Sequence, residues 1–588
     1  MMSDTQKNTP ASPEVEVETD SIINDSVAQS EQLNKSTVGT FTTGEATTSN
    51  SSPQQQPMHW PGYYPGALPT VVVGQNTRIP ELTEWSGQVL QSAHKQPNPH
   101  RQVYRRGNGF TRVVVTNGNE PKTELLDKDG MYGILARSAR WARVQRQEKT
   151  LPDGSTTTVY TLETVDAPHK RLGDLMTWPD VPLPRLKGLS ACPMVLSDGK
   201  IAGTQPGYDP QSAYWFTGTA LPQLPSVEQA RNILVDWLVD FPISEAGRAN
   251  ILGVLIANLL RPLLEYAGLQ AFPGLALTAT SPGSGKTLLA QCIGAVLSGC
   301  TPAMSAFPTD KEEWRKNITS WVLAGQSLQI YDNLPVNTAL DSGHLAGLLT
   351  TGRWSDRLLG ANTTLDVPVS AQVIMTGNNM HLSTELTRRV IVVHVTPDVD
   401  RPWKRTPDNF KHPNIIRYTL THRGEILGAL LSLIQHWVDI GRPKGNEIMG
   451  NYELLTQSVG GILKSAGMVG WLINADESSE KMDEERAVWL GLLETWHEHF
   501  QDVPITAGEL FAQLDDNGML SEIPWFTARD DAGKRRQLGR RIKSQLGAVI
   551  GPWKITEAGR ERSGVPRYCL VTMAQPEHET HNEPSEVY

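Results

Sequence analysis

The sequence has few cysteines and no long hydrophobic run, and these absences argue against several classes of protein. Its four cysteines stand far apart, without a CxxC pair, in a chain of 588 residues. The spacing favours neither a zinc site nor a disulfide framework and fits a reducing compartment. The longest apolar stretch, 251–260, reaches about half the length of a membrane-spanning helix. No charged segment followed by an apolar one opens the chain, so we expect a cytoplasmic protein without an export signal or a membrane partner.

The net charge of −10 is unevenly distributed. Residues 1–60 hold eight Asp or Glu against two Lys, whereas residues 101–171 hold thirteen Lys or Arg against eight acids. Residues 531–571 are the most basic, with ten Lys or Arg and three acids. A partner contacts the charge of one surface and not the net charge of the whole chain. The two basic segments are therefore candidates for binding nucleic acid, although the chain is acidic overall.

The N-terminal part combines a polar tail with a basic segment. Residues 1–75 are rich in Ser, Thr, Asn, Gln and Pro, so we expect them to be disordered. A helix is predicted over 129–144. Arginines at spacings of three would share one face of it, either as a phosphate-contacting surface or as an ordinary solvated face. They are Arg137, Arg140, Arg143 and Arg146.

A glycine-rich loop is the strongest signal in the chain. An apolar strand at 275–279 precedes it and a helix at 288–297 follows, which is the context of a phosphate-binding loop. Lys286 is expected to neutralise phosphates and Thr287 to bind Mg²⁺, with ATP as the nucleotide. Thr280 stands where the first glycine of the pattern is usual. The predicted binding residues are Ser281, Pro282, Gly283, Ser284, Gly285, Lys286, Thr287 and Leu288.

Two further predicted strands end in polar residues. The strand at 327–332 ends in Asp332, a candidate metal ligand, but the following residue is Asn333 rather than the usual glutamate. An amide orients water but does not accept its proton, so the general base is left open between Glu385 and a carboxylate from elsewhere. The strand at 371–376 leads to Asn378 and Asn379. Either amide is placed to contact a γ-phosphate or align water, and Asn378 is the better candidate.

Two arginines and a hairpin complete the central region. Arg388 and Arg389 precede a predicted strand at 390–395 and are candidates for an arginine finger acting on a neighbouring subunit. Residues 348–369 are typical of a β-hairpin with a turn at 360–362. Its tip, with Arg357 and Asn362, is either a contact for single-stranded DNA or a plain edge hairpin.

The C-terminal region indicates a winged helix. Thr506, with Glu509 three residues later, is predicted to cap a first helix. A second, basic helix follows at about 533–546, and two strands at 553–558 and 567–571 complete the pattern. The helix either binds DNA or mediates protein contacts. Its candidate DNA-binding residues are Arg536, Arg540, Arg541 and Lys543.

These motifs, in this order, resemble the superfamily 3 and AAA+ helicase-type ATPases of phages, plasmids and integrated mobile elements, including the C-terminal part of phage-type primase-helicases. The resemblance covers residues 225–570 and is carried by TSPGSGKT, IYDN, GRWSDRLLG, TGNN and LTRRV. It implies Walker A roles for Lys286 and Thr287, a Walker B role for Asp332 and a sensor role for Asn378. It further implies a finger at Arg388 or Arg389.

The expected fold class is α/β, with a P-loop, AAA+-like ATPase core, a mixed α+β N-terminal domain and a C-terminal winged helix. We expect a helicase or translocase that forms a homo-oligomeric ring, for example a hexamer, with single-stranded DNA in its pore and duplex DNA at the winged helix. The alternatives are a nucleotide-gated DNA-binding regulator or loader, and a non-catalytic nucleotide-binding scaffold. The expected divisions are a tail at 1–75, an N-terminal domain at 76–220 that is a candidate for DNA binding, an ATPase domain with an N-terminal helical part at 221–445, a helical linker at 446–502, a winged helix at 503–573 and a tail at 574–588.

Overall fold

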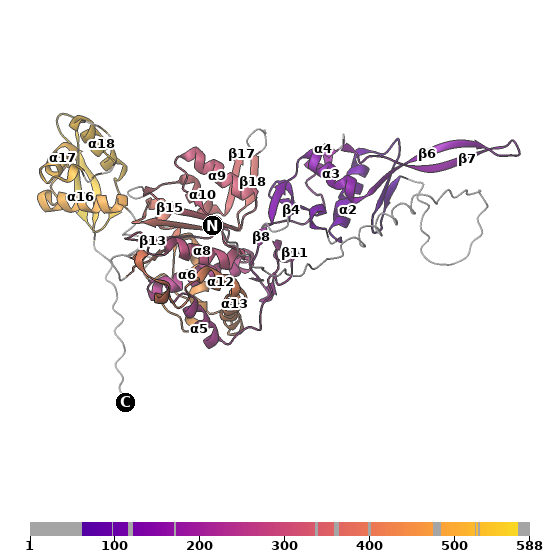
Figure 1. Ribbon diagram of the computed structural model, residues 1–588. Helices are drawn as coiled ribbons and strands as arrows, with labels where there is room; N and C mark the ends of the chain where they lie inside the picture. The colour runs from indigo at the N-terminus through magenta and orange to yellow at the C-terminus, as the bar shows by residue number, and fades with distance from the viewer. Residues whose placement is uncertain are drawn as a thin grey trace, which may run out of the picture. The chain divides into compact units, whose positions relative to one another are not determined.

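The computed structural model describes residues 61–573 except 97, 116–120, 170–171, 336–338, 358–363, 398–401, 474–483, 522, 524, 527 and 529. Most of the expected tail at 1–75, and all of that at 574–588, lies outside the described residues. The chain divides into two units (Figure 1). The first contains residues 61–78 and 140–166, and the second contains residues 79–139 and 167–573. No helix within the described ranges combines the length and apolar character needed to cross a bilayer.

The first unit is a four-stranded sheet in the order β1-β2-β6-β7. Strands β2 and β6 are parallel, and the two outer pairs are antiparallel. Strands β1 and β2 lie within 61–75, where we expected disorder, so that expectation is wrong for these residues. All four residues of β2 are β-branched, which favours a strand, and its Val71 and Val72 are fully buried. The strands are β1 (Gly62–Tyr64), β2 (Thr70–Val73), β6 (Arg140–Thr150) and β7 (Thr156–Thr164).

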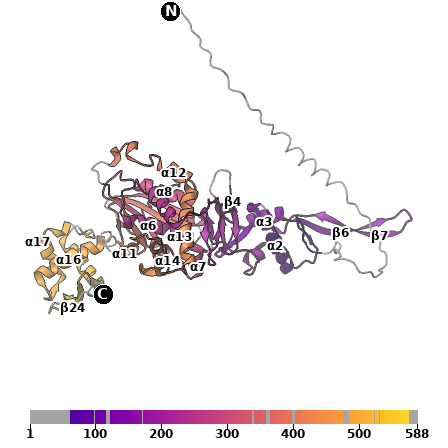
Figure 2. The same cartoon turned by 90° about the horizontal axis from the view of Figure 1, so that it is seen from below.

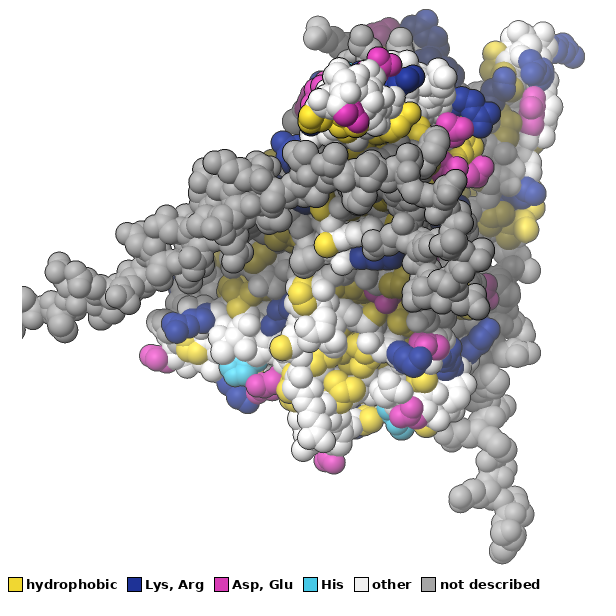
Figure 3. Space-filling model, turned by 90° about the vertical axis from the view of Figure 1, so that its right-hand side faces the viewer, with side chains coloured by type: hydrophobic (Ala, Val, Ile, Leu, Met, Phe, Trp, Pro, Cys, Tyr) yellow, Lys and Arg dark blue, Asp and Glu magenta, His cyan; other side chains and the backbone are white. Residues whose placement is uncertain are grey.

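The predicted helix at 129–144 is correct only as far as Ser138, where α3 (Lys128–Ser138) ends. Arg140, Arg143 and Arg146 lie on strand β6, which pairs with β7 along its length. Residues three apart on a strand point to opposite faces, so the expected basic face does not form. Arg143 instead pairs with Glu163 at 2.9 Å. Figure 3 likewise shows cationic and anionic side chains interspersed on the face that it displays.

A five-stranded parallel sheet forms the centre of the second unit, which is therefore mixed α/β. Its order is β14-β15-β19-β13-β21, so β13 lies between strands that come much later in the chain. The strands predicted around 275, 328, 372 and 390 are all present. Their bounds are β13 (Gly274–Ala279), β14 (Ser305–Ala306), β15 (Leu328–Leu334), β19 (Gln372–Asn378) and β21 (Val390–His394).

Alternate residues of these strands face two hydrophobic cores, as expected for a parallel sheet that is covered on both sides. Leu275 and Leu277 join a core with α5, α6, α8, α13 and α14, whereas Ala276 joins a core with α9 and α10. Figures 1 and 2 show α6, α8, α12 and α13 grouped together, and Figure 1 shows α9 and α10 across the sheet from them. The helices are α5 (Val227–Trp237), α6 (Glu245–Leu259), α7 (Arg261–Tyr266), α8 (Lys286–Ser298), α9 (Lys311–Leu323), α10 (Gly343–Thr351), α11 (Thr384–Thr387), α12 (Ile415–Thr421), α13 (Arg423–Asp439) and α14 (Glu453–Ser465).

Local signals determine where several of these helices begin and end. Ser226 and Gln229 form a capping box at the start of α5. The helical stretch that begins with α6 is interrupted at Leu260, and α7 restarts with Pro262 in its first turn. Proline lacks an amide hydrogen and tolerates only the first turn of a helix, which explains the break.

Residues 79–139 and 167–216 form small sheets and helices that precede the central sheet. An antiparallel sheet has the order β3-β4-β5, and a second sheet has the order β11-β12-β8. The elements are α2 (Ile79–Ala93), β3 (Val103–Arg106), β4 (Gly109–Val114), β5 (Lys122–Leu125), α4 (Leu172–Thr177), β8 (Gly188–Ser190), β9 (Met194–Val195), β10 (Ile201–Ala202), β11 (Gly207–Asp209) and β12 (Tyr214–Phe216).

The β3–β4 turn contacts the end of α9 and the hairpin strand β18 (Thr364–Pro368). Arg106, 5% exposed, donates to the carbonyl of Val322 at 2.7 Å. The neighbouring Thr123 hydroxyl donates to the carbonyl of Leu323 at 2.6 Å. The last carbonyls of a helix lack partners within it, so this sheet caps α9 from outside. The side-chain amide of Asn108 donates to the carbonyl of Thr364, on β18, at 2.6 Å.

The C-terminal module has its own core. Its sheet order is β22-β25-β24-β23, and its buried residues come from α16, α17, α18 and the sheet. The predicted capping box of Thr506 and Glu509 is confirmed. The elements are α16 (Glu484–Phe500), β22 (Ile505–Thr506), α17 (Ala507–Asp516), α18 (Asp531–Ser544), β23 (Val549–Ile550), β24 (Trp553–Arg560) and β25 (Pro566–Thr572).

The buried guanidinium of Arg106 is expected to stabilise the docking of the β3–β4 turn. Burial lowers its pKa to about 10, so it remains charged at neutral pH. Arg106→Ala removes the charged hydrogen bonds to the carbonyls of Val322 and Pro368, at a cost of roughly 1.5–3 kcal/mol each. We expect a lower urea midpoint and faster hydrogen exchange in peptides covering α9 and β18. Arg112→Ala removes only an exposed pair with Glu124 and should change neither measurement. Equal protection in both variants would contradict this assignment.

Candidate functional site

The glycine-rich loop at 280–285 connects β13 to α8. Gly283 and Gly285 have φ of 72° and 97°, left-handed values that disfavour other residues. Gly285 is the N-cap residue of α8, and no side chain from the described residues caps this helix. The first main-chain amides of α8 and the positive end of its dipole therefore face the loop. A loop of this kind is suited to hold an anion.

Lys286 lies inside this loop with its side chain largely buried. Its residue is 7% exposed. The ammonium donates to Asn378 Oδ1 at 2.6 Å and to Ser284 Oγ at 3.0 Å, and approaches the Ser281 carbonyl at 3.5 Å. Burial lowers the pKa of Lys286, and the nearby Asp332 partly opposes this shift. The three acceptors around the Lys286 ammonium are an amide oxygen, a hydroxyl and a main-chain carbonyl, and all of them are neutral.

The remaining predicted binding residues lie on the loop and on the first turn of α8. Thr287 and Leu288 are exposed there, whereas Ser284 is fully buried. Pro282 is exposed and Ser281 half-buried. The sequence signal and the geometry of the loop thus bring all eight residues together.

Asp332 lies at the carboxyl end of β15, facing α8. Thr287 Oγ1 donates to its Oδ1 at 2.9 Å, and Thr376 Oγ1 donates to the same oxygen at 2.5 Å. A hydroxyl and a carboxylate this close form the kind of hard-oxygen pair that binds Mg²⁺ beside a phosphate. Thr376 was missed from the sequence. The available signal was its position two residues before Asn378, on the same face of strand β19.

Asn333 occupies an irregular position in β15. Its φ is 62°, and the register of β15 against β19 shifts between Tyr331 and Leu334. The main-chain amide of Asn333 donates to Thr376 Oγ1 at 3.0 Å, which connects this bulge to the carboxylate network of Asp332. The alternative base, Glu385, is exposed on α11.

The two asparagines after β19 have different surroundings. Asn378 is half-buried and accepts from Lys286. Asn379 is exposed with a φ of 42°, and its amide donates to the carbonyl of Ala279 at 2.9 Å. Asn379 therefore shapes the turn, and only Asn378 contacts the lysine.

The structure also separates the two arginines. Arg389 is half-buried, and its Nε donates to Thr350 Oγ1 at 2.6 Å while another nitrogen donates to the carbonyl of Glu385. Arg388 is exposed. Within the described part of the chain, its side chain makes no hydrogen bond or ion pair. The sequence pattern treated the two arginines alike, but they are not equivalent.

The predicted hairpin is present as a stem formed by β17 (Arg353–Arg357) and β18. Asp356, on the stem, receives bonds from Arg315 and Thr319 of α9, at 2.8 Å and 2.7 Å. Arg357 is exposed at the end of β17. The predicted tip at 360–362, including Asn362, lies outside the described residues.

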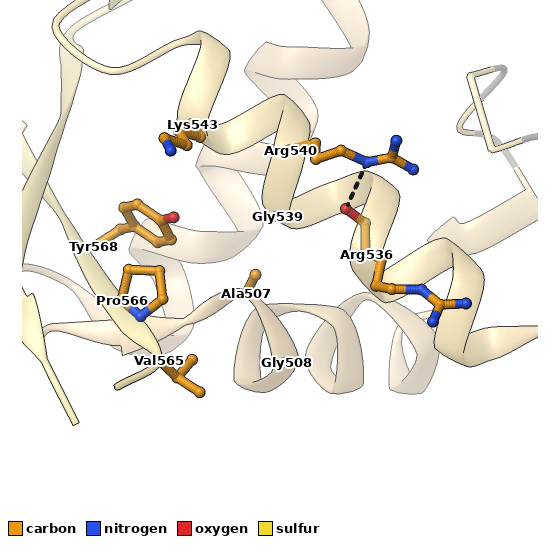
Figure 4. Close-up of a pocket in the computed structure, with 9 residues that line it drawn as sticks. All are labelled: Ala507, Gly508, Arg536, Gly539, Arg540, Lys543, Val565, Pro566 and Tyr568. Carbon is orange, nitrogen blue, oxygen red and sulfur yellow. Dashed lines mark hydrogen bonds between the residues drawn. The ribbon is translucent and has the colours of Figure 1, made fainter. Parts of the chain in front are cut away.

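The basic helix α18 divides its cations between two surroundings. Arg536, Arg540 and Lys543 line a groove of about 580 Å³ between α17, α18 and β25 (Figure 4). These three residues share one helix face by their spacing. Arg541 does not line the groove, and its guanidinium lies 5.5 Å from the ring centroid of Trp525. The other lining residues are Ala507, Gly508, Gly539, Val565, Pro566 and Tyr568.

Comparisons with known proteins add few constraints. No family model matches the chain, and no curated protein matches it either. Solved structures that resemble it in part include the active helicase Cch of SCCmec type IV, with 12% identity, a TM-score of 0.32 and coverage of 81% of this chain and 98% of that one. The A-form apo structure of the NrS-1 C-terminal region has 11% identity and a TM-score of 0.31, and covers 83% and 100%. JCV helicase bound to a substituted acetamide has 17% identity and a TM-score of 0.19, and covers 44% and 74%. TM-scores this low support no inference about activity.

Proposed function

We propose that this chain is a P-loop ATPase of the AAA+ type, acting as a DNA helicase or translocase in the replication of a phage or another mobile element. The observation that carries the proposal is one cluster of polar groups at the carboxyl edge of the parallel sheet. There, Lys286 bonds Asn378 at 2.6 Å and Thr287 bonds Asp332 at 2.9 Å. An amide-rich loop, a buried cation and a hydroxyl–carboxylate pair are the parts that phosphoryl transfer from ATP requires.

Each side chain then has a defined chemical role. The loop amides and Lys286 bind the phosphates and stabilise the charge that develops on them. Thr287 and Asp332 would hold Mg²⁺, which when bound neutralises charge on the β- and γ-phosphates. Asn378 orients the attacking water. Asn333 cannot take up the proton of that water, so the general base is a carboxylate at another position, with Glu385 as one candidate.

We propose that copies of the chain assemble into a ring, with Arg388 of one protomer contacting the nucleotide of its neighbour. Arg388 is exposed and its side chain has no partner among the described residues, which supports a contact with a neighbouring protomer. Arg389 is occupied by Thr350 within its own chain, so it serves the fold. An arginine supplied in trans makes hydrolysis depend on assembly.

DNA is the proposed macromolecular partner, at two places. Single-stranded DNA would contact the hairpin through Arg357 and Asn362 in the pore of the ring. Duplex DNA would contact the groove of the C-terminal module, a proposed winged helix. The three cations of the groove lie on one face of α18, which suits the phosphate backbone of a duplex.

The second candidate function is a nucleotide-gated DNA-binding regulator or loader. Asn333 favours it, because the absence of a glutamate at this position slows hydrolysis more than it weakens binding. A strand-displacement assay separates the two, since a loader would hydrolyse ATP without releasing a strand. A non-catalytic scaffold would bind ATP and release no phosphate, with or without DNA.

Replacing Lys286 tests the nucleotide site directly. Lys286→Ala removes the buried cation that faces the phosphates, so ATP turnover should fall on the order of 100-fold or more. Lys316→Ala is the control, because Lys316 is exposed and pairs only with Glu313 of its own helix. Phosphate release and calorimetry with MgATP measure the two steps. Wild-type turnover in the Lys286 variant would rule out the assignment.

Arg388 and Arg389 are expected to differ when replaced. Arg388→Ala should bind ATP normally, but its turnover should fall at least about a thousandfold. When mixed with wild type, the variant should inhibit it. Arg389→Ala should lower the thermal midpoint, because it removes contacts with Thr350 and Glu385. Turnover that is independent of protein concentration, and no inhibition in mixtures, would contradict a role in trans.

The groove of α18 predicts a salt-dependent effect. Arg540→Ala should weaken duplex binding and reduce the slope of log affinity against log salt by about one. Arg541→Ala, on the same helix but over Trp525, should leave that slope unchanged. Fluorescence anisotropy across a salt series measures both. A module used for protein contacts would show no difference between either variant and wild type.

A further inference from the structure

Trp403 is an unusually exposed tryptophan. It is 58% exposed, whereas every other tryptophan among the described residues is buried or half-buried. A large apolar ring in water costs free energy, and a ring that is exposed beside a binding loop is a candidate contact for a ligand.

The main chain at Trp403 passes directly over the glycine-rich loop. A Cβ added to Gly283 would lie 2.9 Å from the Cβ of Trp403, 3.3 Å from its nitrogen and 3.4 Å from its Cα. Only a glycine therefore fits beneath Trp403, independently of the left-handed φ at this position. The two segments are 120 residues apart in sequence and are in contact here.

The segment that carries Trp403 is folded on itself and is anchored on its C-terminal side. Arg405 donates to the carbonyl of Pro402 at 3.2 Å and stacks on Phe410, with its guanidinium 5.0 Å from the ring centroid. Further along, the amides of Lys411 and His412 donate to the carboxylate of Asp240, at 2.8 Å and 2.7 Å. These contacts hold the turn at 402–404 in place.

The floor of the loop is contacted by a second aromatic residue. Phe241, which follows Asp240, is buried, and its ring lies 3.9 Å from the position of a Cβ on Gly285. Phe241 is thus covered by protein. Trp403 keeps its ring available to a ligand.

The groups of the glycine-rich loop bind phosphates and leave the base of a nucleotide without a partner. Main-chain amides and Lys286 recognise phosphates, and they act equally on any polyphosphate. We propose that Trp403 stacks on the base of the bound nucleoside triphosphate. This inference rests on the proposed nucleotide site. Since every base has a π-face, stacking supplies affinity for nucleotides over bare polyphosphate and little discrimination among bases.

Calorimetry on the full chain with two ligands, MgATP and magnesium tripolyphosphate, tests this assignment. Trp403→Ala should weaken MgATP about 5- to 150-fold, the effect of losing one stacked base. Its affinity for tripolyphosphate, which has no base, should stay within about twofold of wild type. Trp403→Phe should recover most of the MgATP affinity. Tyr266→Ala is the matched control, because Tyr266 is an 81% exposed aromatic residue on α7, and it should alter neither affinity.

The two ligands distinguish the outcomes. An equal loss of affinity for both would mean that Trp403 supports the loop and does not contact the base, and would overturn the stacking. Unchanged MgATP affinity in Trp403→Ala would overturn it as well, while leaving the phosphate site intact. Wild-type protein that binds neither ligand would overturn the nucleotide site itself, and the stacking with it.

Discussion

The buried ammonium of Lys286 is the constraint on which the rest of the site depends. A cation removed from water requires compensation, and its closest acceptors are the neutral oxygens of Asn378 and Ser284. Such partners compensate a charge less well than an anion does. An anion held by the loop amides would complete the surroundings of this cation. Because Lys286 starts α8 and Asn378 ends β19, the same bond also connects the loop to the sheet.

The order of the strands determines which polar groups meet at this point. Strand β19 lies between β13 and β15, and Ala279 of β13 is in register with Asn378. The carboxyl ends of parallel strands form one edge, where ligands bind in open α/β sheets. Asp332 therefore receives one bond from the helix after β13 and one from Thr376 on β19. Each strand contributes a group to a network that none of them could form alone.

The sequence predicted those parts of the molecule that local signals determine. The loop, the strands that lead to Asp332 and Asn378, and the cap at Thr506 depend on residues close together in the chain. The helix predicted over 129–144 was wrong beyond Ser138, because β6 is fixed by pairing with β2, from a distant segment.

The sequence also did not predict that neighbouring arginines have different surroundings, because those surroundings depend on tertiary contacts. Arg388 and Arg389 differ only because Thr350, on another helix, accepts from the second of them. Arg541 differs from Arg540 because Trp525 lies on its side of α18. The position of Trp403 over Gly283 is likewise a long-range contact. None of these tertiary contacts has a local sequence pattern.

The hairpin stem is held from two directions, and this limits how it can move. Asp356 is bonded by Arg315 of α9, while Asn108 bonds both Thr364 and the main chain of Asp366 on β18. Moving the stem alone would break these bonds together, with a loss of roughly 1 kcal/mol or more for each. Moving the stem with α9 and the β3–β4–β5 sheet as one body would break none of them. Since α9 leads directly into β15, which carries Asp332, the body that holds the hairpin is covalently continuous with the strand that forms the candidate metal site. The physical contacts thus favour a concerted displacement of these elements over an independent swing of the hairpin.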